Sequence, residues 1–488
     1  MMQNLSKNKK SYYIHTVIML AIAVAFYFIP AVEPLTPLGM KVLGVFLAML
    51  YGWLFCDVVW PSLFGLLMLG VCGYDKVGTV FASAYGNSTV IMLILFCAVT
   101  AILSAAGIAE YIANKMISLK ILQGRPYVLM LVLLLVMVVL ALTVGATAGF
   151  LIILPLIKEI SKNFGYKPGD KWPMYMILSA AYIDCVSYQL LPFKAGPALV
   201  YGSYTQFSGV EDINYVAYMI CVFAMLVAAI AACVLFCKFV IRPDVSCIQN
   251  SASAVSGGVG KSAETLSSYQ KYVLVSFLVL MIALLWPNVA PASWGITTFL
   301  KNLTTNGILM AYIMIYLFFN FKEGIGFKTI LSRDMAWPAI YLVGAAMTMA
   351  SAFQSEATGI MAWIEKLVTP LVEGQNIYVF VLIIMVLSIV MTNIANNMAT
   401  LAIFTPLAYT IGMSTGANIQ MEALMLCVLM TGATGLITPP ASSISAYMYG
   451  EKEWLPGNCV FKYGALFCCV FNLIIIYIFG FGLGSLLF

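Results

Sequence analysis

Charged side chains are scarce in this sequence of 488 residues, where Asp, Glu, Lys and Arg together make up 9%. Soluble globular domains carry about 25% charged residues, so a water-soluble fold is excluded. Histidine occurs once, at His15, and the 12 cysteines form no CxxC pair. A zinc centre built from a His/Cys cluster therefore lacks ligands. The HExxH motif of zinc proteases is also missing.

Long continuous apolar runs fill most of the sequence, in which 63% of the residues are hydrophobic. Residues 127–145 and 216–237 are each long enough to cross a bilayer core as a helix, which takes about 20 apolar residues. Strands of a transmembrane β-barrel would alternate apolar and polar residues instead. The sequence therefore predicts an all-α polytopic membrane protein that sits in a lipid bilayer.

The net charge of +5 comes from 24 Lys and Arg against 19 Asp and Glu. In a membrane protein such an excess marks cytoplasmic loops, not a nucleic-acid interface. Lys7, Lys9 and Lys10 precede the first apolar span. We expect a multi-pass protein of the cell (inner) membrane with a retained first helix and a cytoplasmic N-terminus.

The most polar long stretch, residues 242–271, is rich in glycine and serine and predicts a flexible linker between two halves. Three pairs of similar segments follow the same order in the two halves. The first pair predicts a helix that bends at Gly107 in the first half and at Gly359 in the second. The second pair predicts a re-entrant hairpin whose second arm contains Pro155 or Pro406. The third pair predicts a broken helix. The paired segments are residues 87–117 with 337–368, 127–160 with 378–411, and 184–202 with 431–450.

Paired interrupted helices in two halves indicate a secondary transporter whose site lies near the middle of the bilayer. Inverted repeats would bring both sets of breaks to that level. The predicted parts are N-terminal helices in residues 1–86, a first repeat in 87–241, the linker in 242–271, further helices in 272–336, a second repeat in 337–450 and a C-terminal helix in 451–488.

Polar residues crowd the predicted hairpin tip of the second half. Unsatisfied polar groups in hydrocarbon are costly, so these side chains either line a site or join helices by hydrogen bonds. Five of them within nine positions favour a site for a cation or an anion. They are Thr392, Asn393, Asn396, Asn397 and Thr400. A second polar break, a site or a simple kink, contains Thr434, Thr438, Pro439, Pro440, Ser442, Ser443 and Ser445.

The first half offers a charged residue in place of a polar tip. Its predicted broken helix contains Lys194, ten residues after Asp184. Intramembrane charges mark function by default, although Lys194 could instead reach a surface loop. Asp184 is either a proton carrier or a partner for a buried basic residue. The matching hairpin tip has mainly small residues: Thr143, Gly145, Ala146, Thr147 and Gly149.

From residue 87 to residue 450 the chain resembles the divalent anion/sodium symporter family, which transports dicarboxylates, citrate or sulfate. The resemblance implies two inverted repeats, each with a re-entrant hairpin and a broken transmembrane helix, and a homodimer that works by an elevator motion. It also implies that residues 1–86 form scaffold and dimerisation helices and that residues 272–336 form scaffold helices. Family hairpin tips carry a Ser-Asn-Thr motif ahead of a proline. Counted back from Pro406 and Pro155, the motif falls on Asn396, Asn397 and Met398, and on Gly145, Ala146 and Thr147; the family's Thr-Pro-Pro break matches Thr438, Pro439 and Pro440.

The resemblance also implies cation sites, with Na+ as a possible coupling ion and no other cofactor. One sodium site would use Thr392, Ala395, Asn397 and Ile437. The other would use Ala141, Gly145, Ala146 and the first-half break at or next to Lys194. Gly145 and Ala146 lack the side chains that this site needs. We therefore expect Lys194 to supply a positive charge where relatives bind sodium.

The predicted function is secondary active transport of a small organic anion, most simply a di- or tricarboxylate, with altered or reduced sodium coupling. Alternatives are a sodium-independent exchanger, a proton-coupled permease for another anion, an ion channel, and a membrane-embedded enzyme in which Asp184 and Lys194 form a dyad. The predicted substrate residues are Thr147, Lys194, Asn396, Asn397, Thr438 and Pro439.

Overall fold

The computed structural model describes residues 9–117, 120–122, 124–210, 213–249, 265–319, 324–333, 335–364, 366, 376–414 and 419–488. Lys7 and residues 250–264 of the predicted linker lie outside the described residues. Every regular element in the described part of the chain is helical, which confirms the predicted all-α class.

The helices of the first half follow one another with short connections. They are α2 (Lys9–Ala25), α3 (Pro37–Phe55), α4 (Val59–Val71), α5 (Val77–Tyr85), α6 (Ser88–Ala105), α7 (Ile108–Ile117), η1 (Lys120–Leu122), α8 (Pro126–Thr143), α9 (Ala146–Asn163), α10 (Lys171–Tyr188), α11 (Ala195–Ser208), α12 (Tyr215–Phe236), η2 (Cys237–Ile241) and α13 (Ser246–Gln249).

The second half repeats much of this order. Its helices are α14 (Ser268–Val289), α15 (Gly295–Phe319), α16 (Phe327–Arg333), α17 (Trp337–Gln354), α19 (Ile377–Ile394), α20 (Asn397–Ser414), α21 (Met421–Gly432), α22 (Ser443–Gly450), α23 (Cys459–Leu466), η3 (Phe467–Asn472), α24 (Leu473–Ile475), η4 (Ile476–Gly482) and α25 (Gly484–Leu487).

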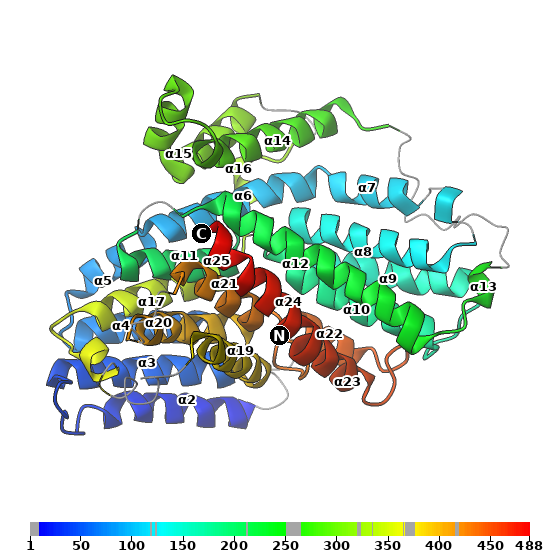
Figure 1. The fold of residues 1–488 in the computed structure, drawn as a ribbon. Coiled ribbons are helices and arrows are strands. Elements are labelled where there is room, and N and C mark those ends of the chain that lie inside the picture. The colour runs from blue at the N-terminus through cyan, green and yellow to red at the C-terminus, as the bar shows by residue number, and fades with distance from the viewer. Residues whose placement is uncertain are drawn as a thin grey trace.

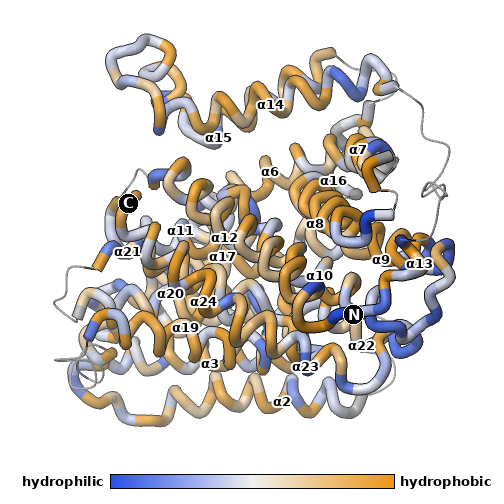
Figure 2. The backbone as a smooth tube through the Cα atoms, turned by 45° about the vertical axis from the view of Figure 1, so that its right-hand side comes forward, coloured by the Kyte–Doolittle hydropathy of each residue, from blue (hydrophilic) through white to orange (hydrophobic). Residues whose placement is uncertain are grey.

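Eight of the described helices are long and apolar enough to cross a membrane. Hydrophobic residues dominate these helices in Figure 2, while hydrophilic residues gather in connecting segments such as those around α13. Large apolar side chains such as Phe223, Ile282 and Phe318 are exposed. Their exposure is explained by a surrounding bilayer, which removes the cost that water would impose on them.

Two layers flank the central helices (Figure 1). α2 packs on α3 along one edge, and α14, α15 and α16 pack on α6 along the opposite edge. Between them, α10 packs against α8, α9 and α12, while α20 packs against α21 and α11. Because α11 belongs to the first half and α20 to the second, the two halves interlock in the centre.

The C-terminal helix is interrupted by two π-helical segments, η3 and η4. Such wide turns shift a helix face, and here Asn472 at the end of η3 is buried against α21. Its amide donates to the Met430 carbonyl at 3.3 Å and to the Thr434 hydroxyl, and its Oδ1 accepts from Tyr182 at 3.5 Å. This residue therefore links α10 of the first half to α21 of the second.

Candidate functional site

The two hairpins break at equivalent positions. α8 ends at Thr143 and α9 begins at Ala146, while α19 ends at Ile394 and α20 begins at Asn397. In both hairpins two residues separate the arms, and the second arm contains a proline nine residues after its start, Pro155 or Pro406. Gly145 thus corresponds to Asn396 and Ala146 to Asn397, the register that counting back from the prolines predicts.

Gly145 adopts a backbone conformation that other residues avoid. Its φ is 109° and its ψ is 161°, a region essentially reserved for glycine. A Cβ built there meets nothing within 4 Å, so the conformation, not space, demands glycine. The serine of the family motif would be strained at this position.

Gly145→Ala should lower the free energy of unfolding by about 1–3 kcal/mol, because alanine must adopt this strained conformation. The thermal unfolding midpoint of the purified protein in detergent measures the effect. Gly78→Ala is the matched control, since a Cβ at Gly78 in α5 also meets nothing within 4 Å and Gly78 has no positive φ. Equal midpoints for the two variants would contradict the conformational argument.

The two broken helices pass through the same region. α10 ends at Tyr188 and the chain resumes as α11 at Ala195, while α21 ends at Gly432 and resumes as α22 at Ser443. Pro192 is buried and Pro439 is exposed. Each break frees backbone groups that a continuous helix would pair, which is tolerated in a membrane protein where the breaks line a cavity.

Both hairpin tips and both breaks meet at one cavity of about 660 Å³. Its lining includes all four residues at which the second arms and second half-helices begin, and none of the described residues that line it is acidic. The residues that line it from these four elements include Gly145, Ala146, Thr147, Lys194, Ala195, Gly196, Asn396, Asn397, Met398, Ala441, Ser442, Ser443 and Ile444.

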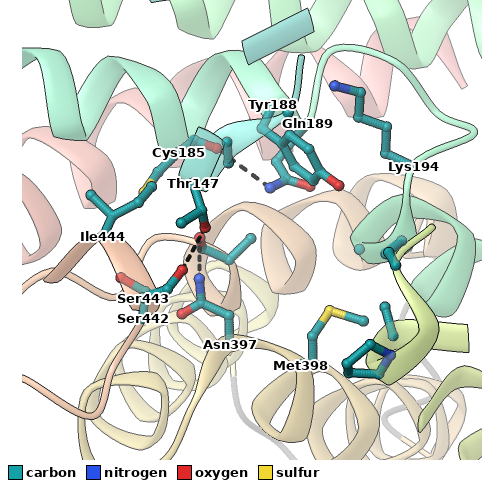
Figure 3. A pocket seen from close by; sticks show the side chains of 18 of the residues that line it. Thr147, Cys185, Tyr188, Gln189, Lys194, Asn397, Met398, Ser442, Ser443 and Ile444 are labelled. Carbon is teal, nitrogen blue, oxygen red and sulfur yellow. Dashed lines mark hydrogen bonds between the residues drawn. The ribbon is translucent and has the colours of Figure 1, made fainter. Parts of the chain in front are cut away.

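The first and second halves touch directly inside the cavity. The hydroxyl groups of Thr147 and Ser443 lie 2.6 Å apart although 296 residues separate them in sequence. Figure 3 shows these two side chains and Asn397 gathered at one side, with Lys194 at the other. Hydroxyl and amide groups from both repeats therefore face one shared volume.

Lys194 is buried, with 3% of its surface exposed. Its ammonium donates to the Ala141 carbonyl of α8 at 2.5 Å and lies 4.2 Å from the centre of the Tyr188 ring. The side chain extends away from Asn397 (Figure 3). This burial excludes the alternative in which Lys194 reaches a surface loop. The ammonium contacts the carbonyl of Ala141, a residue that we expected in the first cation site.

Asn397 and Thr392 form a compact hydrogen-bonded group at the second hairpin tip. The Thr392 hydroxyl lies 2.8 Å from Asn397 Oδ1 and 2.5 Å from the Gly432 carbonyl, and the Asn397 amide donates to the Ala433 carbonyl at 2.8 Å. A Cβ at Gly435 would lie 2.7 Å from Asn397 Oδ1, so the close approach of the break to the tip requires a glycine there.

Asn393 ties the same break to the hairpin from the other side. Its Oδ1 accepts from the Ile437 amide at 2.8 Å, and its carbonyl accepts from the Thr438 hydroxyl. The Ile437 carbonyl accepts from Tyr449 at 2.6 Å. Hydroxyl, amide and carbonyl oxygens suit a hard cation. These contacts join the hairpin tip, which includes the non-helical Ala395, to the break that contains Ile437.

Several predicted residues are not part of the cavity lining. Neither Thr438 nor Pro439 lines the cavity: the Thr438 hydroxyl donates to the Asn393 carbonyl, and Pro439 is exposed. Asn396 lines it, but its side chain accepts from the Ala399 amide at 2.9 Å and donates to the Trp53 carbonyl at 3.3 Å. The predicted cation-site residues outside the lining are Ala141, Thr392, Ala395 and Ile437. The other polar-break candidates outside it are Asn393, Thr400, Thr434, Pro440 and Ser445.

Tyr188 and Gln189 line the cavity and were not expected from sequence. Gln189 is buried, and its Oε1 has no hydrogen-bond partner within the described part of the chain. Both residues stand at the end of α10, just before Pro192. Polar residues next to a proline in an apolar segment are the signal that would have identified them.

The sequence matches the family model described as the sodium:sulfate symporter transmembrane region over residues 10–488. A curated relative is the sodium-dependent dicarboxylate transporter SdcS of Staphylococcus saprophyticus, 20% identical over 328 residues. The match covers 64% of this chain and 61% of that relative, less than two thirds of its length. Among solved structures, the Alcanivorax borkumensis YdaH transporter, described as having an unusual topology, has a TM-score of 0.56 at 15% identity, covering 84% of this chain and 89% of that chain. This last likeness concerns the fold alone.

Proposed function

Because the chain belongs to the sodium:sulfate symporter family, we propose that it moves small organic anions, di- or tricarboxylates, across the membrane by alternating access. The match to the family model over residues 10–488 confirms the predicted family. The name of the relative SdcS supports a dicarboxylate in preference to sulfate. The transport cycle that we propose is an elevator motion in a homodimer of the inner membrane, with the N-terminus in the cytoplasm.

One observation supports an anion as substrate. The N-termini of α9, α11, α20 and α22, at Ala146, Ala195, Asn397 and Ser443, all line the same cavity. Helix N-termini carry a partial positive charge and free N–H groups. Lys194 supplies a basic side chain to the lining, and no carboxylate opposes it among the described residues that line the cavity, so the cavity favours a dianion.

We propose that Lys194 replaces the cation of the first site. Its ammonium donates to the Ala141 carbonyl at 2.5 Å, and the tip residues Gly145 and Ala146 have no side-chain oxygen to offer a metal ion. The second site keeps its oxygen donors, so Thr392, Ala395, Asn397 and Ile437 would hold one sodium ion. Transport then couples to fewer sodium ions than in relatives that keep both sites.

The test is uptake of radiolabelled succinate into proteoliposomes, compared in external sodium and external potassium, with and without unlabelled succinate inside. Uptake that requires sodium supports the second cation site. Sodium-independent uptake that requires internal succinate supports the second candidate, an exchanger, for which Lys194 provides a fixed or protonatable positive charge. If neither succinate nor citrate moves under any condition, di- and tricarboxylate transport is wrong.

A further inference from the structure

Asp184 is the one charged residue of the α10 interior, and the transport scheme above does not use it. It lies 13 residues into α10 and is 0% exposed. Neither carboxylate oxygen has a hydrogen-bond partner within the described part of the chain. A single ion pair is found among the described residues, between Lys158 and Glu451, so Asp184 is not in a salt bridge.

Among the described residues, the helices that pack most closely on α10 bring no other charged side chain near Asp184. α10 packs against α8, α9, α12, α22 and α23, and α8, α12 and α22 contain no Asp, Glu, Lys or Arg. The charged residues of α9 lie in its last turns, and the one in α23 is Lys462. The titratable side chains within electrostatic range of Asp184 are Lys194, Cys185 and Tyr188.

An ionised carboxylate in this position would be buried without a partner, which is among the most unfavourable arrangements in a protein interior. The neutral acid is therefore the form compatible with these surroundings. A route to water is short, since the next residue, Cys185, and Tyr188 one turn later both line the cavity. Asp184 can therefore exchange a proton with the cavity when its surroundings rearrange.

We propose that Asp184 is a proton-binding site that couples anion transport to a proton; this rests on the proposed anion transport. A proton from water in the cavity binds the carboxylate and gives a neutral acid, and the same proton leaves to water on the other side. With Asp184 neutral, Lys194 leaves a net positive charge for the dianion. With Asp184 ionised, the two charges offset each other and the cavity attracts the dianion less.

The experiment uses the full-length protein in proteoliposomes that contain a pH-sensitive dye, with equal sodium concentrations on both sides and with potassium and valinomycin clamping the membrane potential. External labelled succinate should enter together with acidification of the interior. Asp184→Asn mimics the neutral acid, so we expect exchange of external for internal succinate to persist and acidification to be lost. Ser179→Ala is the matched control, since Ser179 is equally buried on the same helix, and we expect both signals to persist.

Two results would overturn the proton site: succinate entry without acidification in the unaltered protein, or unchanged acidification in Asp184→Asn. If no succinate moves in any variant, succinate is not a substrate. Infrared spectroscopy of the detergent-purified protein then tests protonation of Asp184 independently of transport. A carbonyl band of a buried protonated carboxyl group that disappears in Asp184→Asn, but not in Ser179→Ala, supports it. Spectra that do not differ overturn it.

Discussion

In the double variant Ala146→Asn/Lys194→Thr, the ratio of the initial succinate uptake rate in sodium to that in potassium should be at least about tenfold higher than in the unaltered protein. A tenfold change corresponds to about 1.4 kcal/mol, a modest value for one added cation site. The threonine removes the ammonium from the Ala141 carbonyl. The asparagine supplies at the first tip the amide oxygen that Asn397 supplies at the second. The ratio of initial uptake rates in sodium and potassium is the measurement.

Gly145 is left unchanged in this variant because its φ of 109° does not suit a side chain. Lys271→Thr is the control for loss of a positive charge, since Lys271 is exposed in the first turn of α14. We expect it to behave like the unaltered protein. If the double variant transports succinate at equal rates in sodium and potassium, Lys194 does not stand in for a cation.

Asn397→Ala should lower succinate uptake by about 10- to 100-fold. The change removes a hydrogen bond to the Ala433 carbonyl and one from the Thr392 hydroxyl. Leaving buried polar partners unpaired costs about 1–3 kcal/mol. This loss destabilises the contact between the hairpin tip and the helix break, and that contact shapes the cavity. Initial uptake rates, normalised to the amount of folded protein, measure the loss.

Asn376→Ala provides a control within the same hairpin. Asn376 is exposed and accepts from the Tyr378 amide at 2.9 Å at the start of α19, at the opposite end of this arm from the tip. Its loss should reduce stability by about 1 kcal/mol as for other helix caps and leave the uptake rate unchanged. Equal uptake defects in the two variants would mean that Asn397 acts on stability alone.

The hairpin register could be predicted from the sequence because it depends on local features. An apolar arm, a small or polar break and a proline ten residues beyond Gly145 or Asn396 determine where each hairpin turns. The structure places both turns at these residues. Low charge and continuous apolar runs likewise determined the all-helical membrane class, since bilayer thickness sets helix length.

The side chains that face the cavity were decided by packing between distant segments. Thr147 meets Ser443 across 296 residues, and Lys194 meets Ala141 across 53. Thr438 turns to Asn393 instead of lining the cavity. Sequence identifies a polar break, but only the packing of neighbouring helices determines the direction of each side chain, because a buried hydroxyl or ammonium must point to whichever carbonyl the tertiary fold brings within hydrogen-bond reach.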